Sequence, residues 1–174
     1  MRINSKFILK LAIYIAFTLL FLLTQTGITG GLNIFGVKPD LILCVAVVIA
    51  LFENTRYAAT YSMCVGVIFD HTFSSPFLMA GFLLFFTSYL TSYLSKTYLN
   101  KSLVTAYIFL APALVAREII AFFYMLGTWD KFSAVTLFTS TILPEMLLTA
   151  ATLPIVYFAL RYTAGRINYA MTFN

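Results

Sequence analysis

Residues 35–94 read FGVKPDLILCVAVVIALFENTRYAATYSMCVGVIFDHTFSSPFLMAGFLLFFTSYLTSYL, and this stretch decides the fold. It holds three long apolar segments that are separated only by a few polar or turn-forming residues. Apolar runs of this length, without strict alternation of polar and apolar residues, are typical of buried or membrane-spanning helices. We expect helices at residues 39–52, 57–73 and 77–94.

Two aspartates mark the ends of the first two of these helices. Pro39 suits the first helical position because it has no backbone N–H to leave unsatisfied, and Asp40 follows it at the positive end of the helix dipole. The second helix ends in Gly66-Val-Ile-Phe-Asp70. Because helices joined by short turns run in opposite directions, we expect Asp40 and Asp70 at the same membrane face. A carboxylate at a helix C-terminus is unfavourable, so Lys38 or a backbone N–H of the next turn should compensate Asp70.

The composition of the whole chain indicates an integral membrane protein. Of its 174 residues, 61% are hydrophobic and 10% are charged, and the mean hydropathy is +0.95. Soluble domains carry about a quarter charged residues, so this chain lacks the polar surface that water demands. Further apolar segments cover residues 7–23, 102–126 and 132–160, the first of which we expect to be a retained helix. We predict an all-α, polytopic protein in which six transmembrane helices form one domain over residues 1–174.

The positive charges are distributed unevenly between the two predicted membrane faces. With six crossings, eight Lys and Arg residues fall on the side that holds both termini: Arg2, Lys6, Lys10, Arg56, Lys96, Lys101, Arg161 and Arg166. Only Lys38 and Lys131 fall on the other side. Basic loops stay in the cytoplasm, so both termini are predicted to be cytoplasmic, with the chain in the cytoplasmic membrane. The net charge of +5 therefore sets orientation and does not indicate nucleic-acid binding.

Small residues recur every four positions in two of the predicted helices. Ala58, Ser62, Gly66 and Asp70 share one helix face, and Ala12 and Ala16 form a shorter pair in the first helix. Such faces let another membrane helix approach closely. These small-residue faces have two possible roles, packing within the bundle or contact with a partner protein. For a partner, the candidate contact residues are Pro39, Asp40, Gly66 and Asp70.

Charged residues inside the membrane form a second feature. Arg117 and Glu118 lie deep in the fifth predicted helix, where an unpaired charge costs about 2.5 to 3.5 kcal/mol. Counting about 1.5 Å per residue places Glu145 of the sixth helix at the same depth as Arg117, so we predict an Arg117–Glu145 ion pair. Glu118 is the competing partner. The pair is either a structural strut or part of a polar ligand pocket, together with the threonine stripe of Thr141, Thr149 and Thr152.

The sequence shows no motif for catalysis or for a cofactor. Cys44 and Cys64 lie inside predicted helices and are read as small core residues, and the single histidine, His71, lies in a predicted turn. We therefore expect a protein that is not an enzyme and that binds no metal or cofactor.

The central stretch resembles a known family. Pro39-Asp40-Leu41 opens an apolar helix, and Gly66-x-x-x-Asp70 and then Pro76 through Gly81 follow, a pattern that is similar to the rod shape-determining protein MreD. The resemblance covers about residues 35–94. It implies a non-enzymatic scaffold of the bacterial cell-elongation complex, which acts in peptidoglycan synthesis. The implied partners are MreC, the actin-like MreB, the RodA glycosyltransferase and its class B penicillin-binding protein.

The MreD fold is similar to that of the S-components, the substrate-binding subunits of energy-coupling-factor vitamin transporters, and this supplies the alternative. An S-component also has six helices with both termini inside, and a small-residue pair in its first helix, comparable to Ala12 and Ala16. In that case Arg117 and Glu145 would hold a vitamin in a pocket that opens to the outside.

Overall fold

The structure is a computed structural model that describes residues 5–26, 38–72, 79–98, 100–128 and 142–172. The described part is all-helical and contains six α-helices, with no strand among those residues. They are α1 (Ser5–Thr26), α2 (Leu41–Phe52), α3 (Thr55–Thr72), α4 (Met79–Tyr98), α5 (Leu103–Thr128) and α7 (Leu143–Thr172).

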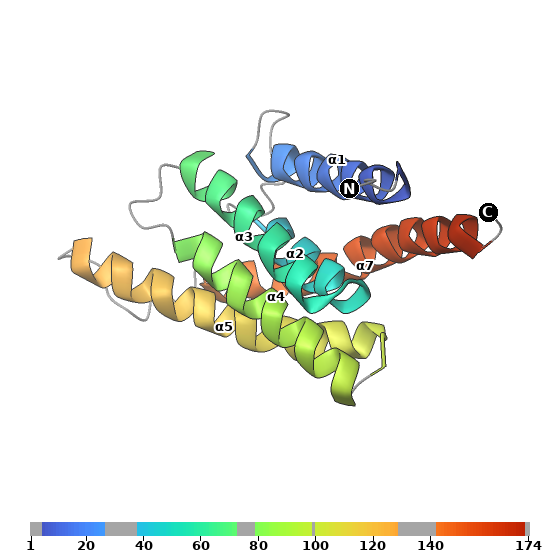
Figure 1. Cartoon of the computed structure of the whole chain (residues 1–174). Helices are drawn as coiled ribbons and strands as arrows, with labels where there is room; N and C mark the ends of the chain where they lie inside the picture. Colours follow the sequence, from blue (N-terminus) through green and yellow to red (C-terminus); the bar gives the residue numbers. More distant parts are fainter. Residues whose placement is uncertain (1–4, 27–37, 73–78, 99, 129–141, 173–174) are drawn as a thin grey trace.

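Helix α2 is the centre of the bundle and packs against α1, α3, α4, α5 and α7 (Figure 1). Every side chain from Leu41 to Leu51 is buried, because the helix is apolar all round and has neighbours on every side. It begins one residue after Asp40, whose carboxylate accepts a hydrogen bond from the Leu43 N–H at 3.1 Å and so caps the helix. The expected start at residue 39 is therefore corrected, and Pro39-Asp40 lies just outside the helix.

Helices α3 and α4 form the closest-packed pair of the bundle. A Cβ atom added to Gly66 would lie only 2.4 Å from the Cα of Gly81, so the two backbones touch where both residues lack a side chain. The Gly81 N–H also donates to the Asp70 carboxylate at 3.1 Å. Asp70 thus binds the first turn of α4. Of the two candidates, Lys38 and a backbone N–H of the next turn, the donor is of the second kind, although it belongs to the helix that follows the turn.

Helix α1 is attached through polar side chains spaced along its length. At one end Glu53 accepts a hydrogen bond from the Tyr14 hydroxyl and pairs with Lys10, at 2.7 and 2.6 Å. In the middle the Thr18 and Tyr61 hydroxyls are 2.7 Å apart. Ala12 and Ala16 are exposed on another face of α1, so they do not dock this helix onto its own bundle.

Several helix ends differ from the expected ones. The last helix continues to Thr172, so Arg161 and Arg166 lie in it and not in a tail after residue 160. Arginine is a good helix former, and the helix continues through Gly165 without ending there. Helix α1 extends to Ser5 and Thr26, α2 ends at Phe52 as expected, and the ends of α3, α4 and α5 shift by one to four residues. The expected start at residue 132 lies outside the described residues, as does Thr141.

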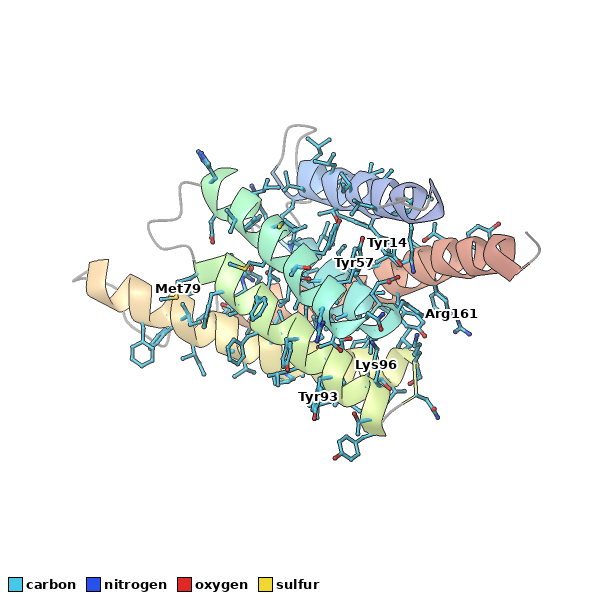
Figure 2. The ribbon with its side chains drawn as sticks, viewed as in Figure 1. Tyr14, Tyr57, Met79, Tyr93, Lys96 and Arg161 are labelled. Atoms are coloured by element: carbon cyan, nitrogen blue, oxygen red, sulfur yellow. The ribbon has the colours of Figure 1, made fainter. Side chains whose placement is uncertain are left out.

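Basic side chains gather at the end of the bundle where α2 terminates. Lys101 donates to the Phe52 carbonyl at 3.3 Å, and Lys96 donates to the Asn54 side chain at 2.7 Å. Figure 2 shows Lys96 and Arg161 on the same side of the molecule, and Met79 at the opposite end. The first turn of α1 and the last turn of α7 also lie on the basic side (Figure 1). This end is hereafter called the basic end.

Within the described residues, two helices are long and apolar enough to cross a membrane by length and composition, over Leu103–Phe123 and Leu143–Thr163. Two shorter apolar stretches cover Lys10–Gln25 and Leu41–Phe52. The 12 residues of α2 span about 18 Å, less than the roughly 30 Å of a hydrocarbon core.

Candidate functional site

A charged cluster lies at the end of α2 opposite the basic end, with the Arg117 side chain of α5 at its centre. The Arg117 Nη1 is 2.6 Å from the Glu145 carboxylate and 3.2 Å from that of Glu118, and its Nε is 3.2 Å from that of Asp40. The ion pair that the sequence predicted between Arg117 and Glu145 is confirmed. Glu118 joins the same guanidinium, and the cluster connects α5, α7 and the start of α2.

Asp40 is the member of the cluster that the sequence analysis missed. It was expected at the membrane face and Arg117 deep inside the membrane, so no contact between the two was predicted. Two distances that follow from residue counts would have placed Asp40 near the level of Arg117. Helix α2 rises about 18 Å from the basic end to Asp40, and α5 rises about 21 Å from Leu103 to Arg117.

The Thr149 hydroxyl connects the backbone of α2 to α7 beside the ion pairs. Its oxygen accepts a hydrogen bond from the Asp40 N–H at 2.9 Å and donates its own proton to the Glu145 carbonyl at 2.7 Å. Thr149 is completely buried. Thr149, which was predicted to line a pocket, therefore links the backbones of Asp40 and Glu145 and stabilises the charged cluster.

The charges of the cluster do not balance. One guanidinium faces the three carboxylates of Asp40, Glu118 and Glu145, and the backbone N–H of Leu43 is a further donor to Asp40. The side chain of Arg117 is 31% exposed, whereas those of Asp40 and Glu118 are about one tenth exposed. Buried carboxylates that share one cation depend on it strongly, because a carboxylate left without it costs several kcal/mol of desolvation.

A cavity of about 560 Å³ adjoins the charged cluster. Asp40, Asp70 and Arg117 form its polar part, and the rest of its wall is apolar. The apolar residues come from α2, α3, α4 and α5: Ile42, Leu43, Phe69, Met79, Ala80, Leu83, Leu84, Ile120, Ala121 and Phe123. The two aspartates that the sequence placed at one face thus line one cavity.

The four residues proposed to contact a partner have internal roles. Pro39 and Gly66 are buried, and Asp40 and Asp70 are only 7% and 2% exposed. Ala58 and Ser62 are buried as well, and the Ser62 hydroxyl is 2.6 Å from that of Ser88 in α4. The small face of α3 is therefore used for packing against α4, which is the first of the two readings.

The described residues offer little for metal or thiol chemistry. No group of three His, Cys, Asp or Glu side chains in this part of the chain is arranged to hold a metal ion. Cys44 is buried in α2 and Cys64 is exposed on α3, and neither forms a disulfide. The arrangement provides a polar strut and an amphipathic cavity.

Comparison with known proteins adds no assignment. No protein-family model, curated protein or solved structure matches this chain.

Proposed function

We propose that this chain is a membrane scaffold subunit of the bacterial cell-elongation complex, of the MreD type, and that it binds MreC. The observation that carries the proposal is the common role of the four residues on which the resemblance rests. Pro39 and Asp40 start the central helix, Gly66 touches Gly81, and Asp70 binds the first turn of α4. The motif is therefore the framework of the α2–α4 unit, as expected for a protein whose role is to present a fixed surface.

The proposal includes six membrane crossings with both termini in the cytoplasm. The basic end, with Lys10, Lys96 and Lys101, would face the cytoplasm, and the charged cluster and cavity would lie toward the outside. Large apolar side chains on the outer faces of α4 and α5 support a lipid environment, because water would disfavour them. Among the most exposed are Phe82, Phe86, Val104, Ile108, Ile119 and Phe123.

A scaffold role fits the charged cluster better than a reactive one. Arg117 is held by three carboxylates, and Thr149 is bonded on both sides. Groups so engaged fix the positions of α2, α5 and α7 relative to one another. The proposed contacts with MreB, RodA and the class B penicillin-binding protein would follow from membership of the same complex.

The test is depletion of this protein in its rod-shaped host, combined with affinity purification from solubilised membranes. We expect rounded cells on depletion and recovery of MreC with the tagged wild-type chain. Gly66→Ala should reduce MreC recovery because it separates α3 from α4, whereas Gly81→Ala, whose added Cβ meets the side chain and backbone of Val67 at 3.1 and 3.3 Å, should retain it. Normal rods after depletion, or no MreC with the wild-type chain, would reject the proposal.

The alternative, an S-component that binds a vitamin, has one observation in its favour, namely the cavity. The two residues expected to hold the vitamin, Arg117 and Glu145, are bonded to each other at 2.6 Å. We therefore favour the scaffold.

A further inference from the structure

The wall of the cavity beside the charged cluster is chemically mixed. Asp40, Asp70 and Arg117 form its polar part, and Leu83, Ile120 and Phe123 are among the apolar side chains of the rest. Its volume of about 560 Å³ lies within the usual range for sites that bind small molecules. Such a space fits a ligand with a charged head and a long apolar part.

The polar part of the cavity favours a head that carries a positive charge. Asp70 is 2% exposed, and among the described residues no cation pairs with its carboxylate, which accepts only the Gly81 N–H at 3.1 Å. Asp40 and two glutamates already share the one guanidinium of Arg117. A buried carboxylate is stable only when it is paired or well hydrogen-bonded. An ammonium group that donates to Asp70 would add a cation to the single N–H donor that the described residues provide.

The opening of the cavity indicates where the ligand comes from. The wall residues most exposed to the surroundings are Met79, Ile120 and Phe123, at 47%, 37% and 69%, and all three are apolar. Met79 begins α4, at the end of the molecule opposite Lys96 (Figure 2). An apolar rim admits a ligand from the bilayer more readily than one from water. The ligand is thus expected to be a lipid that enters between α4 and α5.

We propose that this cavity binds a phospholipid with a primary ammonium head group, of the phosphatidylethanolamine class. The ammonium lies at Asp70, and an acyl chain lies along the apolar wall. An ammonium head group matches the cavity because no described cation pairs with the Asp70 carboxylate, whereas the Arg117 guanidinium is already shared by three carboxylates. The inference rests on the membrane-spanning part of the proposed function and does not depend on MreC.

The experiment is native mass spectrometry of the purified full chain after exchange into equimolar phosphatidylethanolamine, phosphatidylcholine and phosphatidylglycerol. We expect one retained phosphatidylethanolamine, preferred about tenfold over phosphatidylcholine, which has the same charges but no N–H donor. Asp70→Asn should reduce that preference to about twofold or less. Asparagine keeps an oxygen that can accept the Gly81 N–H, so this variant removes the charge and preserves the bond to α4.

A matched pair of tryptophan variants tests the apolar part of the site. Ala121→Trp fills the cavity and should abolish lipid retention, whereas Ala116→Trp, on an exposed face of the same helix, should leave retention unchanged. Equal binding of the three lipids by the wild-type chain would overturn the inference, even if Ala121→Trp failed to fold. Unchanged retention in a folded Ala121→Trp, or a vitamin or a polypeptide retained in place of the lipid, would overturn it too.

The lipid measurement and the MreC measurement fail independently. Lipid selectivity is measured on the isolated chain, so its loss leaves the binding of MreC untouched. Conversely, a chain that selects phosphatidylethanolamine but never recovers MreC would reject the scaffold and keep the lipid site.

Discussion

Arg117→Leu is expected to lower the free energy of unfolding by about 3 kcal/mol, the lower end of the range for removing one partner of a buried ion pair. The lower end applies because the Arg117 side chain is 31% exposed. The loss arises from the carboxylates of Asp40, Glu118 and Glu145, which would keep their burial and lose their shared cation. Equilibrium unfolding in mixed micelles, followed by helical circular dichroism, measures the change.

A control and a rescue make this prediction specific. Arg161→Leu removes an exposed arginine that lies 5.9 Å from the Tyr157 ring, and it should cost less than about 1 kcal/mol. Adding Glu145→Gln to Arg117→Leu should recover part of the stability, since one uncompensated carboxylate is removed. An Arg117→Leu protein as stable as wild type would show that the cluster does not hold α2, α5 and α7 together.

Gly66→Ala is expected to destabilise the protein by about 3 kcal/mol although it adds a single methyl group. The new Cβ would lie 2.4 and 2.7 Å from the Cα and N atoms of Gly81 and 2.9 Å from the Ala80 carbonyl oxygen. All three are backbone atoms, so the clash is relieved only if α3 and α4 move apart. The same unfolding measurement reports the loss.

The matched variant is Gly81→Ala at the same helix crossing. Its Cβ would lie 3.1 Å from the Val67 Cγ2 and 3.3 Å from the Val67 N, which calls for a shift of only a few tenths of an ångström. Replacing glycine by alanine in a helix also gains about 1 kcal/mol of helix propensity. We therefore expect Gly81→Ala to remain within about 1 kcal/mol of wild type. If Gly66→Ala and Gly81→Ala lowered the free energy of unfolding equally, the prediction that only the Cβ at Gly66 forces the two helices apart would be wrong.

Hydropathy and residue spacing were enough to predict the helices and the Arg117–Glu145 pair. Apolar segments of helical length are long-range patterns, and the polar residues between them mark their boundaries. The depth of Glu145 relative to Arg117 followed from counting residues along two neighbouring helices that run in opposite directions. A backbone N–H was one of the two groups predicted to compensate Asp70, because a carboxylate at a helix C-terminus needs a hydrogen-bond donor or a cation.

The parts that could not be predicted depend on how the helices are arranged around α2. Its 12 apolar residues are consistent both with a short membrane span and with a fully enclosed core helix, and only its neighbours distinguish the two. The convergence of Asp40 and Asp70 on one cavity follows from that central position. The contact between Gly66 and Gly81 likewise needs the crossing point of α3 and α4, which residue spacing within one helix does not give.

The most direct test of the account is the side of the membrane on which each end of α2 lies. In a chain with Cys44 and Cys64 replaced by serine, single cysteines at two exposed positions, Lys38 and Asn100, would be labelled with a membrane-impermeant maleimide in intact cells. We predict that Lys38→Cys is labelled from outside and that Asn100→Cys, at the basic end, is labelled only after the membrane is permeabilised. Labelling of Asn100→Cys from outside, or equal labelling of both positions in intact cells, would contradict a bundle that crosses the membrane with its charged cluster toward the outside.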